Sequence, residues 1–194
     1  MLGIAVLVIW VLGRSGDESG GVAAKMREAG CSLATYPAVL NKSDHSDVPS
    51  AETRPKAWNS LPPATGPHFG ETAIWGFYEE PVPLARSLHN LEHGGVTIHY
   101  GPRVRRETIS ELRGFYDDDP NGLIVAPLPE LGKQIALSAW YIPDNRVTEA
   151  GFRGEGQQAK CTTFDRGAYE EFIDTFRYKG PERQDPGTMA PGGT

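Results

Sequence analysis

The chain has 194 residues, including 23 Gly and 16 Pro, and this share of chain-bending residues excludes a helical bundle or a coiled coil. Hydrophobic residues make up 39% of the chain, which is enough for a folded core, and the length suits one domain. The 25 acidic residues outnumber the 19 basic ones and give a net charge of −6. A nucleic-acid partner is therefore not expected, because such proteins carry a basic surface.

The first thirteen residues, MLGIAVLVIWVLG, are apolar without interruption, and Arg14 begins a polar stretch. The run is shorter than the roughly 20 residues that cross a bilayer, and it lacks the basic flank of a signal peptide. We interpret residues 1–14 as part of a membrane anchor whose true start lies upstream, with a buried helix or strand as the alternative. The anchor predicts a domain on the extracytoplasmic side, joined by a linker and short helix over residues 15–29.

The two cysteines, Cys31 and Cys161, are solitary and form no CxxC pair. Such a pair would be expected at a zinc or redox site. Outside the cytoplasm, thiols are oxidised, so an extracytoplasmic location predicts a disulfide between Cys31 and Cys161. For a cytosolic protein, two buried free thiols would be the alternative.

The next segments alternate between irregular and periodic patterns. Residues 23–29 can form one or two helical turns. Residues 41–83 contain seven prolines and show no periodicity, but their aromatic residues need burial, which predicts a long ordered loop over the core. Residues 84–93 follow Pro83, precede Gly94 and Gly95, and are predicted as a short helix.

The second half of the chain is more regular. Strands are predicted at 96–100, 123–126 and 134–141, and helices at 105–116 and 165–178, the latter with Asp165 as N-cap. We expect residues 183–194 to be a disordered tail, because they are polar and rich in Gly and Pro. The fold class is therefore α+β: a single domain over residues 30–182, with a small, mostly antiparallel sheet, a few short helices and the long Pro-rich loop.

Four of the five histidines form a candidate metal site. His89 and His93 stand at i and i+4 of the predicted helix, so both rings project from one face. Pro and Gly around His68 fix its backbone, and His45 lies between two aspartates. Together His45, His68, His89 and His93 predict a copper or zinc site. The alternative is that each is a structural histidine with its own hydrogen bonds. His99 follows strand alternation and is interpreted as a sheet residue.

The helix also reads His-x-x-Glu-His over residues 89–93, which resembles the inverted zinc-peptidase motif of pitrilysin-type enzymes. That resemblance implies that Glu92 activates water as a general base while the histidines bind zinc. The resemblance covers five residues only, and the chain is far shorter than those enzymes.

Several separated motifs resemble, in order, the prokaryotic family catalogued as domain of unknown function 3105. The resemblance spans about residues 30–182 and rests on NSLPPATGPH (59–68), WGFY (75–78), PVP (81–83), HNLEHGGV (89–96) and KGPE (179–182). Ala64 and Thr65 depart from the family's PPTSGPH pattern without touching His68. The resemblance implies an extracytoplasmic domain behind an N-terminal anchor and draws attention to His45, His68, His89, Glu92 and His93. It implies no activity.

Three functions therefore compete. The favoured one is a membrane-anchored protein that binds copper or zinc. The alternatives are a zinc-dependent hydrolase that uses Glu92, and a non-enzymatic structural or interaction module whose histidines hold the Pro-rich loop in place.

Overall fold

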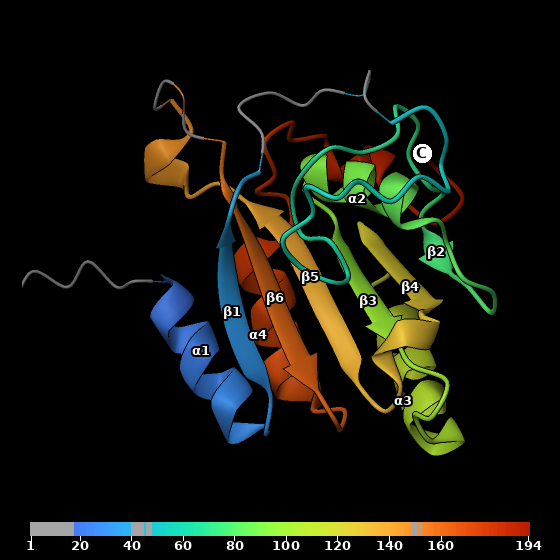
Figure 1. Ribbon diagram of the computed structural model, residues 1–194. Helices are drawn as coiled ribbons and strands as arrows, with labels where there is room; N and C mark the ends of the chain where they lie inside the picture. Colours follow the sequence, from blue (N-terminus) through green and yellow to red (C-terminus); the bar gives the residue numbers. More distant parts are fainter. Residues whose placement is uncertain (1–17, 40–44, 46–47, 149–150, 152) are drawn as a thin grey trace, which may run out of the picture.

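The computed structural model describes residues 18–39, 45, 48–148, 151 and 153–194. These residues form a six-stranded sheet with the strand order β1-β6-β5-β3-β4-β2 (Figure 1). The strands are β1 (Ser32–Pro37), β2 (Gly76–Phe77), β3 (Val96–Tyr100), β4 (Leu123–Pro127), β5 (Ile135–Tyr141) and β6 (Glu155–Cys161). The helices are α1 (Glu18–Glu28), α2 (Leu84–Glu92), α3 (Arg106–Asp118) and α4 (Arg166–Phe176), with short 3-10 helices at Pro129–Leu131, Asp144–Arg146 and Pro186–Thr188.

The sheet is mixed. The β1–β6, β6–β5 and β5–β3 pairs are antiparallel, whereas β3–β4 and β4–β2 are parallel. The predicted α+β class and single-domain fold are confirmed, and antiparallel pairing predominates as expected.

Helices α1, α3 and α4 cover one face of the sheet (Figure 1). Val96, Ile98 and Tyr100 of β3 point to this face, because alternate residues of a strand point to opposite sides. The predicted disulfide between Cys31 and Cys161 is confirmed and lies in the same core, where it joins the start of β1 to the end of β6.

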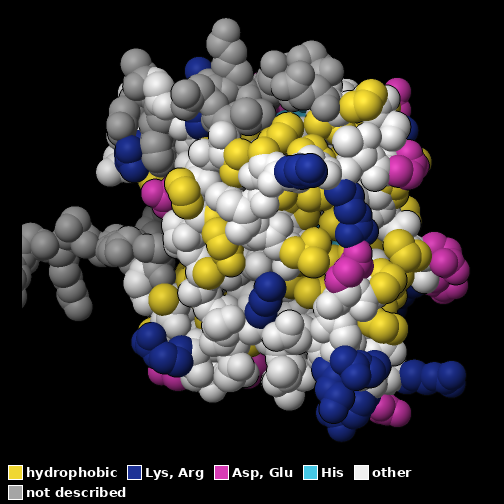
Figure 2. Space-filling view, viewed as in Figure 1, with side chains coloured by type: hydrophobic (Ala, Val, Ile, Leu, Met, Phe, Trp, Pro, Cys, Tyr) yellow, Lys and Arg dark blue, Asp and Glu magenta, His cyan; other side chains and the backbone are white. Residues whose placement is uncertain are grey.

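Helix α2 and the Pro-rich loop, here residues 48–83, cover the other face (Figure 1). Leu88 and Leu91 of α2 pack on Trp140 of β5. In Figure 2, hydrophobic side chains gather over the upper part of this face, and the largest group of Lys and Arg side chains lies at its lower right.

Hydrogen bonds attach the loop to the helix. The Asn90 side chain accepts from the Ala73 backbone amide (2.8 Å) and donates to the Ala73 carbonyl (2.9 Å). The Phe69 amide donates to the carbonyl of Ala85 (3.1 Å). The path of the loop is therefore fixed relative to α2.

The two ends of the domain differ from the prediction. The short helix predicted at residues 23–29 is present as α1, but it begins earlier, at Glu18, and Val22 and Met26 of this helix are fully buried against the sheet, so it belongs to the domain. The tail, residues 183–194, is ordered: Met189 is 1% exposed, and Trp75 exchanges backbone hydrogen bonds with Gly192 and Gly193. A single buried methionine and this short backbone pairing outweigh the polar composition of the tail.

Strands β1, β2 and β6 were not predicted. Strand β6 begins at Glu155, and its central residues Gln157 and Gln158 are buried. Polar residues at buried positions hide the alternation that marks a strand.

No helix in the described part of the chain is long and apolar enough to cross a membrane. The predicted anchor, residues 1–14, lies outside the described residues.

Candidate metal centre

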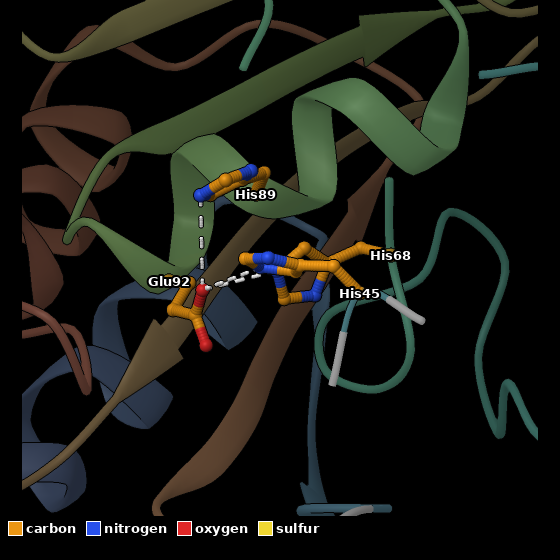
Figure 3. A group of neighbouring side chains, drawn as sticks. All are labelled: His45, His68, His89 and Glu92. Atoms are coloured by element: carbon orange, nitrogen blue, oxygen red, sulfur yellow. Dashed lines mark hydrogen bonds and ion pairs between the residues drawn. The ribbon is translucent and has the colours of Figure 1, made fainter. Parts of the chain in front are cut away.

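Three histidines and one glutamate meet beside α2, where the chain segments that carry His45 and His68 pack against the helix (Figure 3). His89 and Glu92 stand at i and i+3 of α2 and project from the same face of the helix. His68 comes from the Pro-rich loop, and His45 lies shortly before that loop. One ligand atom from each of these four residues lies within 4.8 Å of the others.

The shortest contacts centre on Oε2 of Glu92 and Nε2 of His68. These two atoms are 3.0 Å apart, and His68 Nε2 is also 3.0 Å from Nε2 of His45. Glu92 Oε2 lies 3.6 Å from His45 Nε2 and 3.9 Å from His89 Nε2. The cluster is largely removed from water, since His68, Glu92 and His89 are 0%, 1% and 6% exposed.

Backbone carbonyls orient two of the rings. Nδ1 of His68 lies 2.8 Å from the carbonyl oxygen of Gly66, and Nδ1 of His89 lies 3.0 Å from that of Phe69. A carbonyl can only accept, so each Nδ1 carries the proton and donates. In the neutral rings, each Nε2 therefore presents a lone pair to the cluster, which is how metal-binding histidines are usually held.

Gly66 has a φ of 123°, which favours glycine, and it places its carbonyl where His68 can reach it. Trp140 of β5 supports the same imidazole from the sheet side, with its ring centroid 6.0 Å from that of His68 in an edge-on arrangement. The ring of His68 is thus held on two sides.

The crowding of ligand atoms is the central chemical feature of the cluster. Nε2 of His68 lies 3.0 Å from both Oε2 of Glu92 and Nε2 of His45, and one hydrogen atom on His68 Nε2 can serve only one of these neighbours. A metal ion would accept a lone pair from each of the four groups at once.

Burial and the neighbouring rings favour a neutral His89. Desolvation is the main cause, and His68, His93 and His45 add to it, so the pKa of His89 falls to about 4 against the opposing effect of Glu92. Neutral imidazole is the form that binds metal ions.

His93 does not contribute to this group of ligand atoms, although its ring packs against that of His89 with the centroids 4.6 Å apart. Its Nε2 is 4.0 Å from Oε2 of Glu182, and with Glu92 these residues form a second group of candidate ligands. Burial lowers the pKa of His93, although Glu92 and Glu182 oppose the shift. The structure thus brings together His45, His68 and His89 as expected and adds Glu92, which the hydrolase alternative treated as a base. The sequence had already drawn attention to Glu92, as part of the His-x-x-Glu-His stretch and through the family resemblance, whereas Glu182 was noted only as part of a family motif, without a role.

A cavity of about 790 Å³ adjoins the centre. Its wall includes His89 and His93 together with Arg86 and apolar residues such as Val82 and Pro83. The Arg86 guanidinium pairs with Glu71 at 2.8 Å. The cavity gives small molecules an approach to the face of α2 that carries His89 and His93.

The family described as "Protein of unknown function (DUF3105)" matches residues 51–188. This range includes His68, His89, Glu92, His93 and Glu182. No curated protein and no solved structure matches the chain.

Proposed function

We propose that this chain, which belongs to the DUF3105 family, binds a divalent transition metal ion through His45, His68, His89 and Glu92. The observation that carries the proposal is the convergence of three Nε2 atoms and one carboxylate oxygen, with the Nδ1 protons of His68 and His89 committed to backbone carbonyls. A hydrogen bond between His68 and Glu92 would use only these two groups, whereas a metal ion would use all four.

The donor set favours Zn²⁺ or Cu²⁺. Three imidazoles and one carboxylate suit these borderline divalent ions, whereas Cu⁺ prefers thiolate and thioether ligands. Met189 is the soft ligand that the tail could have offered, but it packs in the cluster that contains Trp75, Val82 and Ile124. We therefore choose Zn²⁺ and Cu²⁺ as the ions to test.

The proposed location is extracytoplasmic. The disulfide between Cys31 and Cys161 fits an oxidising compartment. The apolar residues 1–14 would tether the domain to the membrane, which fractionation of cells expressing the chain with and without these residues would test.

Metal analysis of the untagged protein tests the function. After purification without added metal, we expect bound metal by elemental analysis and tight binding of Zn²⁺ by the chelator-treated protein in calorimetry. His68→Ala and the partly exposed His45→Asn should each weaken binding by at least about 100-fold, because a lost ligand costs more than a lost supporting residue. His99→Leu changes a buried histidine on the sheet face that carries the metal centre, and this variant should bind Zn²⁺ normally. If the wild-type chain binds neither Zn²⁺ nor Cu²⁺, the metal-binding function is wrong, and the alternative of a structural or interaction module is favoured.

The Glu92→Gln variant tests whether Glu92 is a metal ligand or only a general base. The substitution preserves shape but removes the charge, so we expect Zn²⁺ affinity to fall by at least about 10-fold. Undiminished metal binding would remove Glu92 from the ligand set and favour the hydrolase alternative.

A further inference from the structure

We infer that a second divalent cation binds between His93, Glu182 and Glu92, so that the Glu92 carboxylate is shared by two adjacent cation sites. This inference rests on the proposed function, since it assigns Glu92 to both ions. It extends that function from a single ion to a two-cation centre.

The ligand atoms of the second group also lie close together. One ligand atom each from Glu92, His93 and Glu182 lies within 4.8 Å of the others, and His93 Nε2 is 4.0 Å from Glu182 Oε2. A carboxylate has two oxygens and can bind one ion with each. Ions bridged in this way usually lie about 3.5–4 Å apart.

The backbone holds Glu182 in place. The segment from Tyr178 to Gln184 crosses the C-terminal end of α2 and donates three hydrogen bonds to it. The amides of Tyr178, Glu182 and Gln184 bind the carbonyls of Gly94 (2.6 Å), Glu92 (2.9 Å) and His93 (3.3 Å), respectively. Glu182 is therefore fixed to the same turn of backbone that carries Glu92 and His93.

Glycines permit this close crossing. A Cβ atom on Gly180 would lie 2.3 Å from the Glu92 carbonyl oxygen and 2.4 Å from the Gly94 nitrogen. Gly94 itself has a φ of 94°. On the outer side, Arg183 donates to Asp144 and to the carbonyl of Ile142, each at 2.7 Å, which keeps the segment against the domain. Backbone and side-chain hydrogen bonds therefore hold the segment that places Glu182 next to His93.

The two sites differ in their access to solvent. The Glu182 side chain is 49% exposed and that of His93 is 18% exposed, whereas Glu92 is buried. The second site also has three protein ligands, compared with four at the first. We expect the second ion to bind more weakly and to keep open coordination positions for water or a small anion, which can approach through the cavity that His93 lines.

Stoichiometry tests the second site. Titration of the chelator-treated, untagged chain with Zn²⁺ should give two equivalents, the second at least about 10-fold weaker than the first. Glu182→Gln and, separately, His93→Asn should lose the weaker equivalent and keep the tight one within about 3-fold. Glu111→Gln, on the exposed surface of α3, is the matched control and should retain both equivalents.

Electron paramagnetic resonance gives an independent readout of proximity. With two equivalents of Cu²⁺, the wild-type chain should show dipolar coupling between the spins, and Glu182→Gln should show one isolated Cu²⁺ signal. A single equivalent in the wild type, unchanged by Glu182→Gln, would overturn the second site and leave the first intact. Two uncoupled equivalents that survive both substitutions would place the second ion elsewhere. No binding at all would instead overturn the proposed function.

Discussion

His99 differs from the clustered histidines in what surrounds its ring. It lies on β3 and is 1% exposed, and neither ring nitrogen has a hydrogen-bond partner in the part of the chain that the structure describes. Burial lowers its pKa to about 4. His99 is therefore neutral in the folded protein at physiological pH and resists protonation well into the acid range.

We expect His99 to make the fold sensitive to acid. In the unfolded chain this group takes up a proton near its ordinary pKa of 6.5, whereas the folded chain resists until pH 4. Above pH 6.5, His99 therefore does not lower the free energy of unfolding. As the pH falls from 6.5 to 4, the cost of keeping His99 neutral lowers this free energy by about 3 kcal/mol. His99→Leu should remove this part of the pH dependence and leave stability at pH 7 equal or higher, because it removes unpaired polar atoms.

Urea unfolding in chelator at several pH values between 7 and 4 would measure the difference between the two proteins. Other groups, including His89, contribute equally to both curves and cancel in that difference. Parallel curves for wild type and His99→Leu would show that His99 does not cause the acid sensitivity.

The candidate site was only partly predictable at the level of residues. The spacing of His89 and His93 is local to one helix, and from it the sequence indicates a histidine site on α2. It does not tell which of the two rings faces His45 and His68. The tertiary structure pairs His89 with them and directs His93 to Glu182, because the Pro-rich loop covers one side of the helix face and the segment after α4 covers the other.

At the scale of elements, the crossing of residues 178–184 over the end of α2 is the contact most sensitive to a small change. Gly180→Ala would place a methyl group against the backbone of Glu92 and Gly94, which cannot move aside as a flexible side chain can. We expect a loss of about 2 kcal/mol in stability and weaker metal binding, because the Glu92 backbone must shift.

Gly114→Ala is the matched control for this prediction. Gly114 lies inside α3, and a Cβ atom there would meet nothing within 4 Å. This variant should be more stable than wild type by about 0.5–1 kcal/mol, since alanine favours the helix, and it should bind metal normally. Thermal unfolding and Zn²⁺ calorimetry of both variants would check the pair. Equal stability of Gly180→Ala and wild type would show that the crossing tolerates a side chain.

Elements with a strong local pattern were predictable. The helix expected at 84–93 is α2, Leu84–Glu92, and Asp165 caps α4 by accepting from the Ala168 amide at 2.9 Å. Strand β6 was missed because its buried residues include Gln157 and Gln158. Gln158 can be buried there since its side chain donates to the Pro62 carbonyl (2.7 Å), a partner that only the folded loop supplies.

At the scale of the whole molecule, the disulfide covalently links two distant parts of the chain. It joins Cys31 and Cys161, which are 130 residues apart in sequence, on the sheet face opposite the metal centre. Replacing both cysteines by alanine should lower the free energy of unfolding by up to about 5 kcal/mol, because the unfolded chain regains the entropy of an open loop.

Chemical denaturation of the double variant, compared with wild type before and after reduction, would measure this loss. Metal affinity should change little while the variant stays folded, since the centre is built on the other face of the sheet. A loss below about 1 kcal/mol would indicate that the reduced, unfolded chain is already constrained.

The sequence by itself determined the α+β class, the helices and strands with a strong local pattern, and the presence of a histidine pair on one helix. These features depend on local spacing and composition, whereas the disulfide followed only from the expected extracytoplasmic location. Only the tertiary structure decided which side chains form the centre. His68 reaches α2 through a loop without periodicity, His45 comes from the residues just before that loop, and Glu182 lies 90 residues beyond Glu92 along the chain. Such contacts depend on how the loop and the last segment pack against the helix, through Asn90, Gly94 and Gly180, and no local pattern encodes that packing.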